Sequence, residues 1–246
     1  MTDNVLLSIK NVSNVYVSRR LNLFGKKEIK KILNNINLEI RHGEIFGLTG
    51  KSGCGKTTLA RCILNLIDYE GEIEAEGKKL NAAKFQARRA KKFTAQMIFQ
   101  DPGASLNPVK NIGWLIEEPL VIQKTGTMQN QAKFTAQERQ KKVDQMLLKV
   151  GLDSSYKTRR AHELSGGQKQ RVCIARALIL EPRLLIADEA ISSLDVSAGV
   201  QILNLFKELN ENTGLAILFI SHNKDAVEYL CGRVAVMEKG AIRNII

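Results

Sequence analysis

The segment that most constrains this fold is a glycine loop at residues 50–57, which fits the pattern G-x-x-x-x-G-K-[ST]. Residues 44–49 before it are predicted to form a buried strand, and residues 56–66 after it a helix. Backbone N–H groups of such a loop converge on phosphates, and the helix N-terminus adds a favourable dipole. The loop therefore predicts a triphosphate site on an α/β core. The expected nucleotide contacts are Gly50, Ser52, Gly53, Cys54, Gly55, Lys56, Thr57 and Thr58; Lys56 would meet the β- and γ-phosphates, and the Thr57 hydroxyl Mg²⁺.

Strands and helices alternate on both sides of a mostly helical middle. Apolar strands that alternate with helices imply a largely parallel, buried sheet. We expect one domain over residues 1–246, with antiparallel strands near the N-terminus and a helical subdomain inserted at approximately 101–164. The strands are predicted at 6–10, 36–40, 44–49, 71–75, 97–100, 183–188, 215–220 and, as the last, 233–238; the helices at 56–66, 112–123, 136–150, 166–180, 196–212 and 225–230.

Composition narrows the functional classes. The net charge of +12 gathers at residues 19–31 and 78–92, but only 5% of the chain is aromatic and no base-stacking platform accompanies these stretches. We therefore expect a solvated basic face, or one that meets anionic lipid, and no nucleic acid. No apolar run reaches the roughly 18–20 residues that span a bilayer, and no secretory signal opens the chain, so a cytoplasmic protein is expected. Four widely spaced cysteines predict neither a disulfide framework nor a zinc site.

Two acidic residues, Asp188 and Glu189, end an apolar strand. A carboxylate there is costly to bury without a cation. Asp188 alone would also suit the start of a helix. With the glycine loop upstream, the pair favours another interpretation: Asp188 acts on Mg²⁺, mostly through water, and Glu189 polarises the water that attacks ATP.

The segment Leu164-Ser165-Gly166-Gly167-Gln168, followed by Lys169-Gln170-Arg171, resembles the signature motif of ATP-binding cassette (ABC) ATPases. The other motifs occur in the family's order, so the resemblance covers essentially the whole chain. It implies a RecA-like P-loop NTPase core and a head-to-tail dimer that sandwiches two ATP molecules. Ser165 is predicted to cap a helix whose free N–H groups attract anions. In the family, this segment covers the γ-phosphate held by the opposite subunit.

The resemblance also assigns the remaining site residues. Gln100 matches the glutamine of the Q-loop, which contacts Mg²⁺ and water and links the two subdomains. Asp195 belongs to the D-loop, which communicates across the dimer, and His222 matches the switch histidine that contacts the γ-phosphate. Tyr16 is the expected adenine-stacking residue, with Phe24 as a competing candidate.

Two positions depart from the family pattern. Ala190-Ile191 follows Glu189 where Pro-Thr is usual, and Asn223 follows His222 where aspartate is common. Neither change removes a group that contacts phosphate, so an active ATPase with altered turnover is expected.

A subfamily is indicated by residues 100–108, which resemble the extended Q-loop of importers for peptides and nickel. Residues 195–197 and 201–205 favour the same group, whereas 188–192 and the chain length resemble the nickel type more closely. Peptide and nickel therefore both stay open as cargo. The implied partners are membrane permeases, a second ABC ATPase (identical or paralogous) and, indirectly, an external solute-binding protein. The implied location is the inner face of the cell membrane, where ATP closes the dimer and hydrolysis reopens it.

Three other ABC classes are alternatives to an importer subunit. An accessory subunit of phosphonate breakdown by carbon–phosphorus lyase is similar in length and Q-loop. DNA-repair and chromosome-type proteins place coiled coils or zinc modules between the glycine loop and the signature, and this chain has neither pattern. Translation-associated factors normally carry two cassettes, whereas this chain has one.

Overall fold

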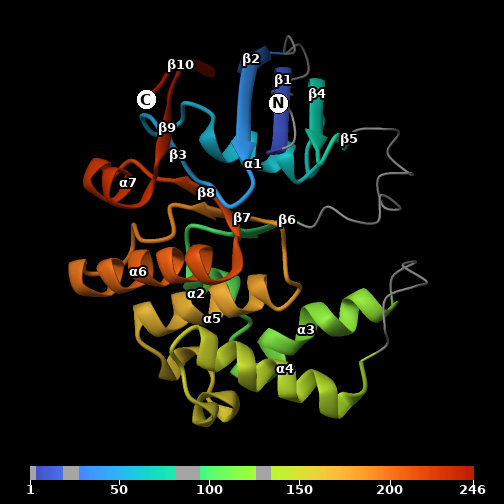
Figure 1. The fold of residues 1–246 in the computed structure, drawn as a ribbon, viewed down its shortest axis with the longest axis vertical. Coiled ribbons are helices and arrows are strands. Elements are labelled where there is room, and N and C mark those ends of the chain that lie inside the picture. Colours follow the sequence, from blue (N-terminus) through green and yellow to red (C-terminus); the bar gives the residue numbers. More distant parts are fainter. Residues whose placement is uncertain (1–3, 19–27, 81–94, 126–133) are drawn as a thin grey trace, which may run out of the picture. The chain divides into compact units, whose positions relative to one another are not determined.

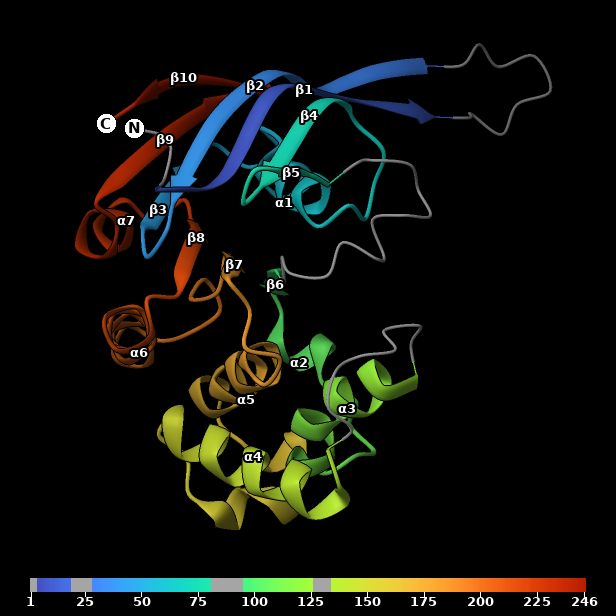
Figure 2. The ribbon, with the colours of Figure 1, turned by 45° about the vertical axis from the view of Figure 1, so that its right-hand side comes forward.

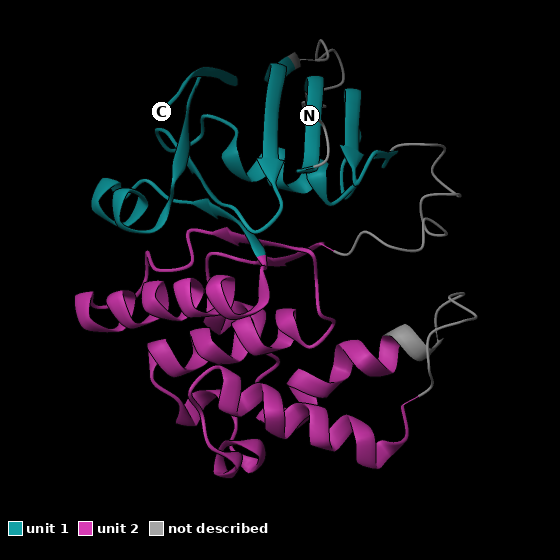
Figure 3. Ribbon diagram, in the orientation of Figure 1, with its two compact units in different colours: residues 1–93, 216–246 teal, residues 94–215 magenta. Residues whose placement is uncertain are grey.

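The computed structural model describes residues 4–18, 28–80, 95–125 and 134–246. The chain divides into two compact units (Figure 3): unit 1 comprises residues 1–93 and 216–246, and unit 2 comprises residues 94–215. Each unit has buried aromatic side chains of its own, such as Phe46 and Phe219 in unit 1 and Phe206 in unit 2. The predicted boundaries of a helical subdomain at about 101–164 stay a prediction.

Unit 1 contains the antiparallel region expected near the N-terminus. Strand β1 (Val5–Ser18) pairs antiparallel with β2 (Glu28–Arg41) and β4 (Glu70–Ala75), and β4 pairs with β5 (Lys78–Lys79). Strands β1 and β2 are both longer than predicted. Polar residues are interspersed along their outer parts, so these parts resemble a loop in sequence. The candidate Phe24 lies outside the described residues.

The strand that precedes the glycine loop lies in the parallel part of unit 1. Strand β3 (Ile45–Thr49) is parallel to β8 (Ala216–Ile220) on one side and to β9 (Arg233–Glu238) on the other. All five residues of β8 are buried, which explains its continuous apolar sequence. Helices α1 (Lys56–Ile63) and α7 (Lys224–Leu230) follow β3 and β8 along the chain.

The prediction that residues 233–238 form the last strand was wrong. Strand β10 (Ala241–Ile245) returns antiparallel to β9 (Figure 2). The reversal takes place at Lys239 and Gly240, which have φ angles of 47° and 80°. A left-handed lysine is uncommon, so the turn has only a weak sequence signal.

Unit 2 holds two parallel strands and most of the helices. Strand β6 (Ala95–Ile98) is parallel to β7 (Leu184–Asp188), and helix α5 (Gly166–Leu178) lies between α4 (Ala136–Lys149) and α6 (Val196–Thr213) in both ribbon views (Figures 1 and 2). The helices lie at the predicted places, with ends shifted by a few residues. The unit also contains α2 (Pro102–Ser105), α3 (Ile112–Thr125) and the 3-10 helices η2 (Ser154–Thr158) and η3 (Ala161–Glu163). Among the described residues, no helix is both long and apolar enough to cross a bilayer.

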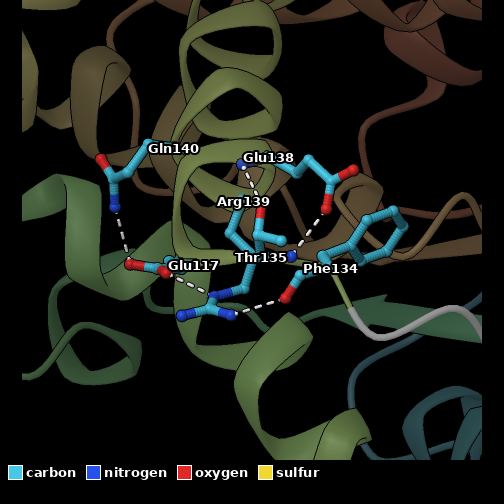
Figure 4. Close-up of polar contacts among 6 residues, drawn as sticks. All are labelled: Glu117, Phe134, Thr135, Glu138, Arg139 and Gln140. Atoms are coloured by element: carbon cyan, nitrogen blue, oxygen red, sulfur yellow. Dashed lines mark hydrogen bonds and ion pairs between the residues drawn. The ribbon is translucent and has the colours of Figure 1, made fainter.

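A half-buried polar cluster joins α3 to the start of α4 (Figure 4). The Arg139 Nε lies 2.6 Å from Glu117 Oε1, Gln140 Nε2 donates to Glu117 Oε2 at 2.8 Å, and Arg139 Nη1 donates to the Phe134 carbonyl at 2.9 Å. Thr135 caps α4 through a reciprocal capping box with Glu138. The Glu117 carboxylate therefore balances the charge of Arg139 and holds the start of α4 in one direction relative to α3.

We expect Glu117→Ala to destabilise unit 2 by about 2 kcal/mol, because it leaves a mostly buried guanidinium without its anion. The side chains of Glu117 and Arg139 are only 14% and 16% exposed. Glu238→Ala is the matched control, since its partner Arg243 is 59% exposed and such pairs contribute about 0–1 kcal/mol. Urea denaturation measures both variants, and equal losses would contradict the structural role of Glu117.

Candidate ATP-hydrolysis site

The phosphate loop lies in unit 1, between β3 and α1. Gly53 and Gly55 have φ angles of 75° and 112°, which L side chains rarely adopt, and Gly55 caps α1. The buried Lys56 ammonium donates to the carbonyl of Gly50 at 2.8 Å and to that of Lys51 at 3.3 Å. These bonds hold the cation over the loop. The geometry of the loop is therefore that of an anion receptor.

The end of β9 and the turn that follows it pack against the phosphate loop. A Cβ atom at Gly50 would lie 2.2 Å from the Met237 carbonyl oxygen, and Gly240 N–H donates to the Cys54 carbonyl at 3.0 Å. Sequence reasoning missed this support because it missed β10. The only local signal was Gly240 after an apolar strand.

Unit 1 also holds His222 and Tyr16. Leu48 of β3 and Ile220 of β8 are register partners in parallel strands, so the phosphate loop and His222 follow neighbouring strand ends at one edge of the sheet. His222 is exposed, and Ser221 N–H donates to the Leu48 carbonyl at 3.2 Å. Tyr16 lies on β1 and is 62% exposed, which leaves its ring accessible for stacking.

Unit 2 holds the two carboxylates at the end of β7. Asp188 is only 4% exposed, and Glu189 follows it with a φ of 52°. A left-handed glutamate is uncommon and marks a locally constrained backbone. The Ser192 N–H and Oγ both donate to the Glu189 carbonyl, at 3.1 and 2.9 Å. These bonds fix the direction in which the chain leaves the strand.

The signature segment begins α5 with a reciprocal capping box. Ser165 Oγ accepts from Gln168 N–H at 3.3 Å, and Gln168 Oε1 accepts from Ser165 N–H at 2.9 Å. At Gly167 the helix comes close to α6, because an added Cβ atom would lie only 3.2 Å from Ala198 Cβ, whereas a Cβ on Gly166 would make an ordinary contact of 3.4 Å with Leu194 Cδ2. The S-x-x-Q spacing could have revealed the capping box from the sequence.

Two further predicted residues sit beside helix starts in unit 2. Gln100 is exposed and lies just beyond β6, next to Asp101, whose carboxylate caps α2. Asp195 is exposed and caps α6 by accepting from Ala198 N–H at 2.8 Å. The carboxylate of Asp195 thus has a local structural role besides the predicted one across the dimer.

The comparisons with known proteins decide the family. A family model described as ABC transporter matches residues 33–192. This chain belongs to the ABC transporter family. It is an ATP-binding subunit whose ATP hydrolysis is coupled to transport.

Relatives of this ABC ATPase are similar along its whole length. The oligopeptide transport ATP-binding protein OppF of Haemophilus influenzae is 43% identical over 96% of this chain and 67% of its own. OppF of Streptococcus mutans is 42% identical over 100% of this chain and 76% of its own. The ATP-binding cassette MJ0796, solved as a dimer with ADP and phosphate after hydrolysis, superposes with a TM-score of 0.82 at 28% identity, covering 98% of each chain.

The cysteines of this ABC ATPase differ in their surroundings. Burial raises the pKa of Cys62, Cys173 and Cys231 to about 12, so these thiols stay protonated at neutral pH. Cys54 lies inside the phosphate loop, with its Sγ 2.8 Å from the position of a Cβ on Gly50. Within the described ranges, no group of three or more His, Cys, Asp or Glu side chains could hold a metal ion.

Proposed function

We propose that this ABC ATPase is the energy-coupling subunit of an importer for oligopeptides. The observation that carries the proposal is the capped signature helix in a chain 42–43% identical over nearly its full length to two oligopeptide transport ATP-binding proteins. Nickel, the other cargo indicated by residues 188–192, has no comparable support among these relatives. Peptide is therefore the proposed cargo.

Each group of proposed site residues has its own role. Lys56 and the loop amides hold the β- and γ-phosphates, and Glu189 polarises the attacking water. Hydroxyl, amide and carboxylate oxygens, such as those of Thr57, Gln100 and Asp188, are ligands that suit Mg²⁺, which would neutralise charge on the phosphates. His222 contacts the γ-phosphate, Tyr16 stacks on adenine, and the signature segment of one subunit covers the nucleotide of the other.

The proposed membrane partner is a permease segment that binds a groove in unit 2. This groove has a volume of about 500 Å³ and is lined by Phe99, Pro119 and Ile122, among others. Phe99 and Ile122 are 47% and 60% exposed. Phe99 directly precedes Gln100 in the chain, so an occupant would contact the segment that carries this glutamine. This arrangement suits a peripheral subunit at the inner face of the membrane.

Co-purification and stimulated ATPase activity test the proposal. We expect the chain to co-purify with two membrane permeases and a second ABC ATPase, and the assembly to hydrolyse ATP faster when a peptide-loaded binding protein is added. Stimulation by nickel complexes but not by peptide would identify nickel, instead of peptide, as the cargo. Association with a soluble lyase complex would overturn the importer assignment.

A further inference from the structure

The signature helix is tied to a tyrosine that lies outside the recognised motifs. Gln168 not only closes the capping box on Ser165; its Nε2 also donates to the Tyr156 hydroxyl at 2.9 Å. Both side chains are half-buried. Because one amide makes both bonds, the position of the tyrosine hydroxyl determines the rotamer with which Gln168 reaches Ser165.

Tyr156 is itself held from two sides. The guanidinium of Arg159 lies over its ring, 4.2 Å from the centroid, and Arg159 N–H donates to the Tyr156 carbonyl at 3.1 Å. Asp153 starts η2 by accepting from Ser155 N–H at 2.8 Å. The hydroxyl is therefore presented by a turn with a defined geometry, not by a mobile side chain on an open surface.

The η2 segment is also hydrogen-bonded to the beginning of α3. Ile112 N–H donates to the Arg159 carbonyl at 2.9 Å, and Asn111 forms a β-bridge with Arg160. A Cβ on Gly113 would lie 3.2 Å from the Lys157 carbonyl oxygen, so the two segments are in close contact. Helix α3 also contributes Glu118, Pro119 and Ile122 to the groove described above.

We propose that Tyr156 is a positioning residue of the ATPase, which orients the signature segment through Gln168 and links it to α3. This proposal rests on the proposed function, in which Ser165 meets the nucleotide of the opposite subunit. The first turn of α5 must then be held in one orientation before the dimer closes, since preorganised donors pay no reorganisation cost during the reaction. The Tyr156–Gln168 bond supplies that constraint.

The first test is Tyr156→Phe, which removes the hydroxyl and keeps the ring. We expect the kcat for ATP to fall roughly three- to tenfold, the effect of losing one neutral hydrogen bond. Binding of a fluorescent ATP analogue to the phosphate loop should stay unchanged, because the loop lies in unit 1. Tyr229→Phe on α7, where the ring is 53% exposed, is the matched control and should leave both quantities unchanged. Equal kcat values for Tyr156→Phe and the wild type would overturn the proposal.

A double-mutant cycle separates positioning from general destabilisation. Gln168→Leu removes both bonds of the amide, so Tyr156→Phe should cost nothing further in that background. The same three- to tenfold fall in both backgrounds would show that Tyr156 acts by another route, and would overturn the proposal.

Hydrogen exchange reports on the protein without requiring hydrolysis or transport. The amides of Ser165, Gln168 and Lys169 are bonded within the start of α5. We expect them to exchange faster in Tyr156→Phe than in the wild type or in Tyr229→Phe. Unchanged exchange would overturn the proposal even if the assembly imports peptides. Faster exchange in an assembly that imports nothing would support the role of Tyr156 and contradict only the transport assignment.

Discussion

Glu189→Gln is expected to bind ATP while losing nearly all turnover, with a fall in kcat of about 10²–10⁴. The amide is nearly isosteric with the carboxylate and cannot accept the proton of the attacking water. The backbone at this position is already constrained, with a φ of 52° and two hydrogen bonds from Ser192 to the Glu189 carbonyl. The substitution should therefore change the chemistry and leave the local conformation intact. Steady-state phosphate release and nucleotide binding measure the two effects separately.

The chain offers a close control for this variant. Glu181 also has a positive φ, of 51°, and also lies in unit 2, but its side chain is 75% exposed and pairs with Lys142 on the surface. Glu181→Gln should keep normal turnover. If Glu189→Gln still hydrolysed ATP at the rate of Glu181→Gln, the assignment of Glu189 as the residue that polarises water would be wrong.

Lys56→Ala is expected to weaken ATP binding at least tenfold and to lower turnover at least about a hundredfold. The ammonium is buried and donates to two loop carbonyls, so it is already placed where phosphate oxygens would arrive. Charge-assisted hydrogen bonds are about twice as strong as neutral ones, and stabilisers of developing charge contribute about 10²–10³ in rate. Titration with a fluorescent ATP analogue and steady-state kinetics measure the two losses.

Lys10→Ala provides the control in the same unit. Lys10 is 52% exposed and pairs with Glu74 on the surface of the antiparallel sheet, an interaction that contributes little. The Lys10→Ala substitution should therefore leave ATP affinity and turnover unchanged. Normal ATP affinity in Lys56→Ala would contradict the proposed phosphate contact, whereas equal losses in both variants would indicate a general effect of removing a cation.

The sequence predicted the parts of the fold whose information is local. A glycine loop between an apolar strand and a helix specifies its own backbone, because positive φ angles at Gly53 and Gly55 need residues without a Cβ. The continuous apolar run of β8 likewise implied a buried parallel strand. Helices in unit 2 were recognisable from their periodicity, and only their ends moved.

Other parts depended on contacts between distant residues. Strand β10 was missed because Lys239 adopts a left-handed turn that no residue preference suggests. The support of Gly50 by Met237 joins segments that are far apart in the sequence. The outer part of β1 forms because β2 supplies hydrogen-bond partners, although its polar residues resemble a loop.

The amino-acid order by itself determined the family and the chemical identity of the site, since the phosphate loop, the acidic pair and the signature are short motifs with characteristic residue types. Tertiary structure alone decided that Gln168 also bonds Tyr156. A side-chain amide can bond any nearby donor or acceptor, and only the folding of η2 against α3 brings the Tyr156 hydroxyl within 2.9 Å of it. Motifs specify which groups are present, but packing between elements determines where those groups are held.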